Sequence, residues 1–133
     1  MESLERIAER HGIRLLLQFG STVTGHVHPN SDTDLAVLLE RLPTSFGEYG
    51  RLTSDLQEAF QGAFHGREVD VSVVNHADPL FLKKILESCR LLHGDPRDLQ
   101  RLRIYGFKRY QDHRRFLDLE RRYVRDAVRR RVS

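Results

Sequence analysis

Three aspartates beside apolar, strand-like runs constrain this chain more than any other feature. Asp32 and Asp34 stand two residues apart at the start of one apolar run, and Asp70 lies inside a later one. An ionised carboxylate in a buried strand is costly unless it is paired or bound to a metal. Arg67 is the adjacent cation, so Asp70 is either part of a metal site or paired with Arg67 or a more distant arginine.

The spacing of these aspartates favours a site for divalent cations. Alternate side chains of a strand project to the same face, so Asp32 and Asp34 should point together, with Cα atoms about 6–7 Å apart. Two-metal sites hold their ions roughly 3.5–4 Å apart, which suits such a pair with one more ligand. Asp70 is the expected third ligand, and oxygen-only ligands suit Mg²⁺. A solvated Asp-x-Asp turn is the plainer interpretation of the pair alone.

The pair Gly20-Ser21 follows the apolar run 13–19 and is a candidate phosphate-binding turn. Glycine lets backbone N–H groups approach phosphate oxygens, and the serine hydroxyl adds a donor there. A triphosphate held by Gly20 and Ser21 would present its α phosphorus to an acceptor hydroxyl near Asp70, with pyrophosphate as the leaving group. By itself, glycine-serine before a helix is more often an ordinary turn.

Hydrophobic periodicity predicts an alternation of helices and strands. Helices are expected over 3–11 and 43–64, after the Asp-Pro pairs at 78–79 and 95–96, and for one or two turns over 22–26. Strands are expected over 13–19, 34–39 and 68–74, and a short strand or extended segment over 90–94. His26 and His28 fall near the candidate site and are interpreted as surface-loop residues, since their spacing matches no zinc pattern.

Length and composition favour one domain with one core. The chain has 133 residues, of which 39% are hydrophobic, and it contains no apolar run of the roughly 18 residues that a membrane-spanning helix needs. The acidic, polar start does not resemble a secretory signal. A single cysteine, Cys89, excludes an internal disulfide and is interpreted as a packed thiol. We therefore expect a cytoplasmic protein.

Basic residues are concentrated at the C-terminal end. Residues 1–94 carry nine Lys/Arg against thirteen Asp/Glu, a net charge of −4, whereas residues 95–133 carry thirteen against six, a net charge of +7. Gly106 should weaken the helix expected there by roughly 1 kcal/mol relative to alanine. Docking of this helix on an acidic protein surface is favoured, and stacking of its tyrosines on RNA is the less favoured alternative. The helix has one apolar stripe, made of Leu99, Leu102, Tyr110, Leu117, Val124 and Val128, and its tyrosines are Tyr105, Tyr110 and Tyr123.

Taken in order, these motifs resemble the signature of the DNA polymerase beta-like nucleotidyltransferases. The matching segments are Gly20-Ser21 through Gly25, then Ser31-Asp32-Thr33-Asp34-Leu35-Ala36-Val37, then Asp70. The resemblance implies an α/β fold with a small mixed sheet flanked by helices and a long basic C-terminal helix. It divides the domain into a nucleotidyltransferase core over 1–94 and a helical extension over 95–133.

The same resemblance implies the chemistry of the site. Asp32, Asp34 and Asp70 match the metal-binding catalytic aspartates, and Gly20 and Ser21 match the phosphate-contacting pair. Magnesium, with two ions, and ATP as substrate are implied with them.

Length and the segments after Pro79 narrow the resemblance to the antitoxin branch of the minimal nucleotidyltransferases. In that branch the partner is typically a HEPN-domain ribonuclease toxin, and AMP is transferred from ATP to a tyrosine hydroxyl of the toxin. A hetero-complex or oligomer is therefore expected. Members commonly carry arginine where this chain has Thr24. Two alternatives stay open: an antitoxin that binds nucleotide and acts by contact alone, and a nucleotidyltransferase acting on RNA or a small hydroxylated molecule.

Overall fold

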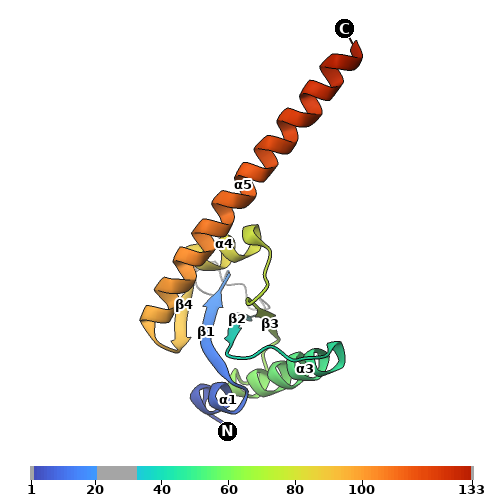
Figure 1. Cartoon of the computed structure of the whole chain (residues 1–133). Coiled ribbons are helices and arrows are strands. Elements are labelled where there is room, and N and C mark those ends of the chain that lie inside the picture. The colour runs from blue at the N-terminus through green and yellow to red at the C-terminus, as the bar shows by residue number, and fades with distance from the viewer. Residues whose placement is uncertain (1, 21–32, 133) are drawn as a thin grey trace.

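The computed structural model describes residues 2–20 and 33–132, which form a small mixed sheet between two pairs of helices (Figure 1). The described strands are β1 (Ile13–Phe19), β2 (Thr33–Leu39), β3 (Val69–Val73) and β4 (Arg90–His93). The described helices are α1 (Leu4–Arg10), α3 (Phe46–Ala63), α4 (Pro79–Glu87) and α5 (Pro96–Val132). This arrangement confirms the predicted α/β fold with a mixed sheet and a long C-terminal helix.

The strand order β3-β2-β1-β4 sets which residues become neighbours. β1 pairs antiparallel with both β2 and β4, whereas β2 pairs parallel with β3. β3 is therefore an edge strand. A parallel pair needs a long crossover between its strands, and here the 18-residue helix α3 supplies it.

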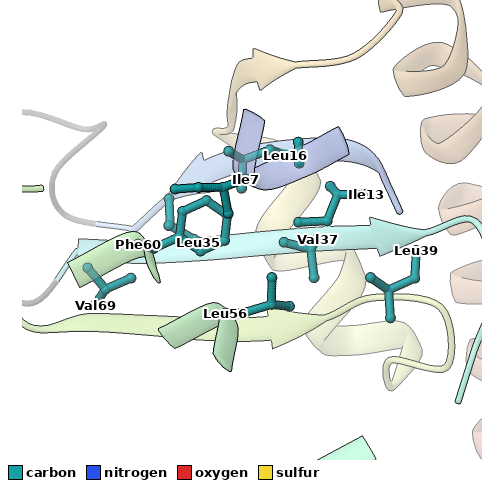
Figure 2. Packing of buried hydrophobic residues seen from close by; sticks show 10 residues of the cluster. Ile7, Ile13, Leu16, Leu35, Val37, Leu39, Leu56, Phe60 and Val69 are labelled. Atoms are coloured by element: carbon teal, nitrogen blue, oxygen red, sulfur yellow. The ribbon is translucent and has the colours of Figure 1, made fainter. Parts of the chain in front are cut away.

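One face of the sheet packs against α1 and α3. Figure 2 shows side chains from these helices meeting residues of β1, β2 and β3. Leu35 and Val37 of β2 point into this layer with Leu56 and Phe60 of α3, and all four are fully buried. Alternation along β2 leaves the intervening residues for the opposite face.

The opposite face packs against α4 and the first turns of α5. Its buried residues are Leu15, Leu17, Phe19, Ala36, Val74, Leu82, Ile85, Leu99 and Leu102. An irregularity in the β1–β2 register between Ile13 and Leu15 explains why Ile13 and Leu16, three residues apart, face the same side. Arg14 at this irregularity is exposed and forms an ion pair with Asp98 of α5, with Nε 3.3 Å from Oδ2.

Polar side chains fix where the helices begin. Ser3 and Ser45 accept hydrogen bonds from the backbone N–H groups at the third positions of α1 and α3. Asp78 does the same for α4 ahead of Pro79. Asp95, ahead of α5, accepts from the Arg97 backbone N–H and side chain, and both bonds lower the pKa of its carboxyl group. Both Asp-Pro helix starts are thereby confirmed.

Gly106 has a packing role that the sequence analysis missed. A Cβ atom at this position would lie 2.8 Å from Cδ1 of Leu86 and 3.4 Å from Leu82, both on α4. The missing side chain lets the two helices approach closely. The helix-weakening interpretation of Gly106 is therefore incomplete, because the lost propensity is offset by contact between α4 and α5.

The structure tests some of the remaining predictions and leaves others as predictions. Of residues 90–94, left open between strand and extended segment, Arg90–His93 form strand β4. Cys89 is half-buried, with its Sγ 3.6 Å from an Arg103 nitrogen. The helical turns expected over 22–26, and His26 and His28, lie outside the described residues. The division into a core over 1–94 and an extension over 95–133 stays a prediction. Within the described segments, no helix is long and apolar enough to cross a membrane.

Gly94 provides a test of this architecture. Its φ of +118° is unfavourable for residues with a side chain, and a Cβ would lie 2.5 Å from the backbone oxygen of Arg14. We expect Gly94→Ala to lower the free energy of unfolding by at least roughly 1–3 kcal/mol, measured by urea denaturation. Gly62→Ala is the matched control, because Gly62 lies in α3 with nothing within 4 Å of the added atom. Equal stability of the two variants would contradict the packing of β4 against β1.

Candidate active site

Three adjacent strands bring the described candidate residues together at one end of the sheet. In the parallel β2–β3 pair Asp34 is the register partner of Asp70, and in the antiparallel β1–β2 pair Asp34 is the partner of Phe19. Gly20 follows Phe19 directly. Neighbouring strands lie about 4.8 Å apart, so Asp34 and Asp70 are side by side, with Gly20 at the next strand end.

Both carboxylates lie on the face that carries α4 and α5. Ala36 packs into the core on that face, and Asp34 shares its side because strand residues two apart point the same way. Register partners also share a side, which places Asp70 there as well. Asp34 is half-buried and Asp70 is exposed. Solvent can therefore reach the pair.

Asp70 corrects one step of the sequence analysis. We expected a buried carboxylate that needs a counterion because of its burial, but its side chain is exposed. Among the ion pairs of the described residues, none joins Asp70 to Arg67. The reason for a cation is instead the pairing of Asp70 with Asp34, since like charges directly opposite on adjacent strands repel.

Gly20 is required by close approach to Asp34. Its φ is +83°, and a Cβ atom there would lie 2.4 Å from Oδ2 of Asp34. A larger residue would push the Asp34 carboxylate aside or shift the end of β1. The missing side chain thus holds the turn of the chain against the carboxylate, where its backbone can also approach a ligand bound by Asp34.

The described residues fit a divalent cation in part. Asp34 and Asp70 supply the oxygen ligands that Mg²⁺ prefers, and the missing side chain of Gly20 leaves room for the Asp34 carboxylate. Asp32, Ser21 and Thr24 lie outside the described residues, so the predicted three-carboxylate set stays a prediction. Considering only residues 2–20 and 33–132, no three His, Cys, Asp or Glu side chains gather into a metal-binding group.

Phe81 is a site neighbour that the sequence analysis did not single out. Its ring meets Phe19 edge to face, with centroids 6.0 Å apart and planes at 83°, and Phe19 is the register partner of Asp34. Phe81 is more than a third exposed, so an apolar ring borders the carboxylates on the α4 side. The Asp78-Pro79 start placed Phe81 in the first turn of a helix, but only tertiary packing sets which strand that turn meets.

The fold and the paired aspartates define a protein of the nucleotidyltransferase class. The family model described as Polymerase beta, Nucleotidyltransferase matches residues 2–98. This match spans most of the chain, and the chain belongs to that family. A comparison with curated proteins found no match.

Several solved structures share the fold. A toxin-antitoxin structure with AMP-PNP superposes with a TM-score of 0.69 at 23% identity, covering 92% of this chain and 93% of that chain. A complex of tri-AMPylated HEPN toxin with MNT antitoxin from Shewanella oneidensis gives 0.63 at 20% identity, covering 92% and 90%. The toxin-antitoxin pair MntA-HepT gives 0.61 at 21% identity, covering 92% and 91%. At these identities the likeness establishes the fold.

Gly20→Ala tests the contact with Asp34. We expect the variant to lose affinity for Mn²⁺, used as a spectroscopic substitute for Mg²⁺, by about 10–100-fold, the range typical when a ligand's support is removed. Electron paramagnetic resonance titration gives the free Mn²⁺. Gly12→Ala is the control, because Gly12 also has a positive φ of 65° but nothing within 4 Å of an added Cβ. Unchanged Mn²⁺ affinity in Gly20→Ala would contradict a metal site at Asp34.

Repulsion between the two aspartates predicts that either a bound cation or the loss of one charge stabilises the fold, and that the two effects do not add. In buffer containing EDTA, Asp70→Asn should raise the free energy of unfolding by roughly 0.2–1 kcal/mol, because it removes a like-charge pair across the strands. Adding Mg²⁺ should then raise the melting temperature of the parent protein and leave that of Asp70→Asn nearly unchanged. Differential scanning fluorimetry measures both effects. A parent protein indifferent to Mg²⁺ would be inconsistent with metal binding by this pair.

Proposed function

We propose that this chain is a Mg²⁺-dependent nucleotidyltransferase that transfers AMP from ATP to a tyrosine hydroxyl of a HEPN ribonuclease toxin, and so acts as its antitoxin. The observation that carries the proposal is the register pairing of Asp34 with Asp70 beside Gly20, in a member of the nucleotidyltransferase family. The choice of ATP and of the toxin is supported by solved neighbours crystallised with AMP-PNP and with an AMPylated HEPN toxin.

Each candidate residue has a part in the proposed reaction. Asp34 and Asp70, with Asp32 as the expected third ligand, would hold Mg²⁺ at the strand end. Gly20 keeps the chain close to Asp34, and Ser21 is the expected phosphate contact. Bound Mg²⁺ would neutralise charge on the triphosphate and favour ionisation of the attacking hydroxyl.

The transfer itself balances without a further reactant. The tyrosine oxygen forms a bond to the α phosphorus of ATP while the bond from that phosphorus to the bridging oxygen of the β phosphate breaks, and pyrophosphate leaves. The hydroxyl proton passes to a base, for which the Asp70 carboxylate is our candidate. Asp70 is exposed on an edge strand. A hydroxyl carried by another protein can therefore reach it.

Transfer of label from ATP to the toxin tests the proposal. The chain is incubated with Mg²⁺, ATP labelled at the α phosphate and the product of the adjacent reading frame, which the proposal expects to be a HEPN ribonuclease. Labelled residues are identified by mass spectrometry. We expect label on tyrosine, and a loss of at least about 100-fold in rate for Asp34→Asn with Asp70→Asn, because even outer-shell changes at metal sites cost 10–100-fold. Asp55→Asn, an exposed carboxylate on α3 at the other face, is the control.

The same variants separate catalysis from inhibition by contact. If the double variant still protects cells from the ribonuclease, the chain neutralises its partner by binding, and the catalytic proposal fails. If label appears on RNA ends or on a small hydroxylated compound and not on the toxin, the acceptor is wrong while nucleotidyl transfer stands.

A further inference from the structure

The outer part of α5 is a helix with little to pack against. α5 has 37 residues, a length of roughly 55 Å at about 1.5 Å per residue, and its C-terminal part projects away from the sheet (Figure 1). We call residues 114–132 the distal segment. Its large apolar side chains are mostly exposed: Phe116 and Leu119 are each 63% exposed and Tyr123 is 76% exposed. Val124 and Val128 are more than half exposed as well.

These side chains are not scattered around the helix. Phe116, Tyr123 and Ala127 follow helical spacing, with Val124 and Val128 adjacent on the same half of the surface. The apolar stripe predicted from Leu99 to Val128 is buried against the core only in its first part. Leu99 and Leu102 are buried, whereas the distal side chains are exposed. A contiguous apolar stripe of this kind marks an interaction surface.

The charge of the distal segment selects the kind of partner. It contains eight arginines against three acidic residues, a net charge of +5. Arg114, Arg121 and Arg125 form a row at helical spacing beside the apolar stripe. Two copies of the segment packed together would bring these like charges close, which costs free energy. An acidic protein surface is the complementary occupant.

A groove adjoins the distal segment and reaches the first turn of α4, the helix that contacts the end of β1. This groove of about 410 Å³ lies between α4 and the middle of α5. Its charged lining is Arg114, Arg121 and Asp118, so arginines outnumber the one carboxylate, and Leu80 and Leu117 are its aliphatic residues. Leu80 is next to Phe81 in α4, whose ring contacts Phe19. In Figure 1 the arrow of β1 and the free end of α5 point toward the same side of the molecule. A protein bound along the distal segment would therefore border the candidate active site.

We propose that the distal segment and the groove beside Leu80 form the docking surface for the acceptor protein, which presents an acidic surface with apolar side chains between its carboxylates. This inference rests on the proposed function for the identity of that protein. Docking along α5 holds the acceptor so that its hydroxyl passes the first turn of α4 and reaches Asp34 and Asp70. In this proposal α5 binds the acceptor protein, and the strand end with Asp34 and Asp70 carries out the transfer.

Two variants remove the proposed contacts without touching the core. Phe116→Gln with Tyr123→Gln removes apolar area, and Arg121→Glu with Arg125→Glu reverses charge; both pairs replace exposed residues with good helix formers. Phe46→Gln is the control, since Phe46 on α3 is 93% exposed and lies on the other face of the sheet. Circular dichroism verifies that each variant is folded.

The experiment compares the acceptor protein, which the proposed function expects to be a HEPN ribonuclease, with a short synthetic peptide that carries its acceptor tyrosine. We expect each double variant to raise KM for the intact ribonuclease at least about tenfold, as loss of central interface side chains does, while kcat/KM for the peptide and the Phe46→Gln values stay unchanged. A loss on the peptide as well would overturn docking, because the variants would then have damaged the active site. An unchanged KM for the ribonuclease would also overturn it.

Direct binding measurements keep this inference separate from the proposed function. If no transfer occurs but the double variants weaken binding of the ribonuclease in isothermal titration, docking stands and the catalytic proposal fails. If transfer occurs and binding is unaffected by the variants, docking fails and the catalytic proposal stands. A parent protein that is dimeric by light scattering and becomes monomeric in the double variants would assign the surface to a second copy instead. Loss of RNA binding in the variants, with ribonuclease binding intact, would assign it to RNA.

Discussion

Asp34 and Asp70 carry like charges on adjacent strands, and the packing of the sheet keeps them together. The parallel register that pairs them also pairs Leu35 with Val71, and Leu35 is fully buried under α1 and α3. A slip of one residue would move these apolar side chains to the wrong face. Burial of one face of β2 therefore holds two repelling carboxylates in place on the other. Two carboxylates held together in this way are oxygen ligands of the kind that divalent cations prefer.

The irregularity in β1 connects this site to α5. Because the register shifts near Arg14, Leu15 and Leu17 face α4 and α5 while Leu16 faces α1 and α3. Arg14 itself is left exposed and pairs with Asp98 in the first turn of α5. The last residue of the strand, Phe19, keeps the orientation that brings it against α4. The irregularity thus places Arg14 beside the start of α5, and regular alternation from Leu15 to Phe19 sets the apolar side chain at the strand end.

Local patterns in the sequence predict most of the helices and strands. They do not predict which strands pair or which helices touch, because those contacts join residues far apart in the chain. Apolar runs and the Asp-Pro pairs predicted the strands and helix starts, because periodicity and capping act within a few residues. Register, however, depends on which strands pair, so the sequence could name Asp34 and Asp70 but could not show that they are directly opposed. The same limit applies to Gly106, whose role depends on α4, and to Phe81. The exposure of Asp70 contradicted an argument from apolar neighbours alone, because an edge strand leaves one side open.

The aspartates at the strand end and the arginine-rich helix α5 differ in what they can recognise. Asp34, Asp70 and Gly20 do not by themselves distinguish the hydroxyl of a protein from that of an RNA or a small molecule. Selectivity for a large acceptor requires contacts away from the reacting atoms.

In the described part of the chain, most of the exposed large apolar side chains belong to α5, where the arginines are also concentrated. A periodic stripe in a sequence does not distinguish a helix buried in its own core from one that awaits a partner. Burial of Leu102 and exposure of Tyr123 on a single helix make that distinction here.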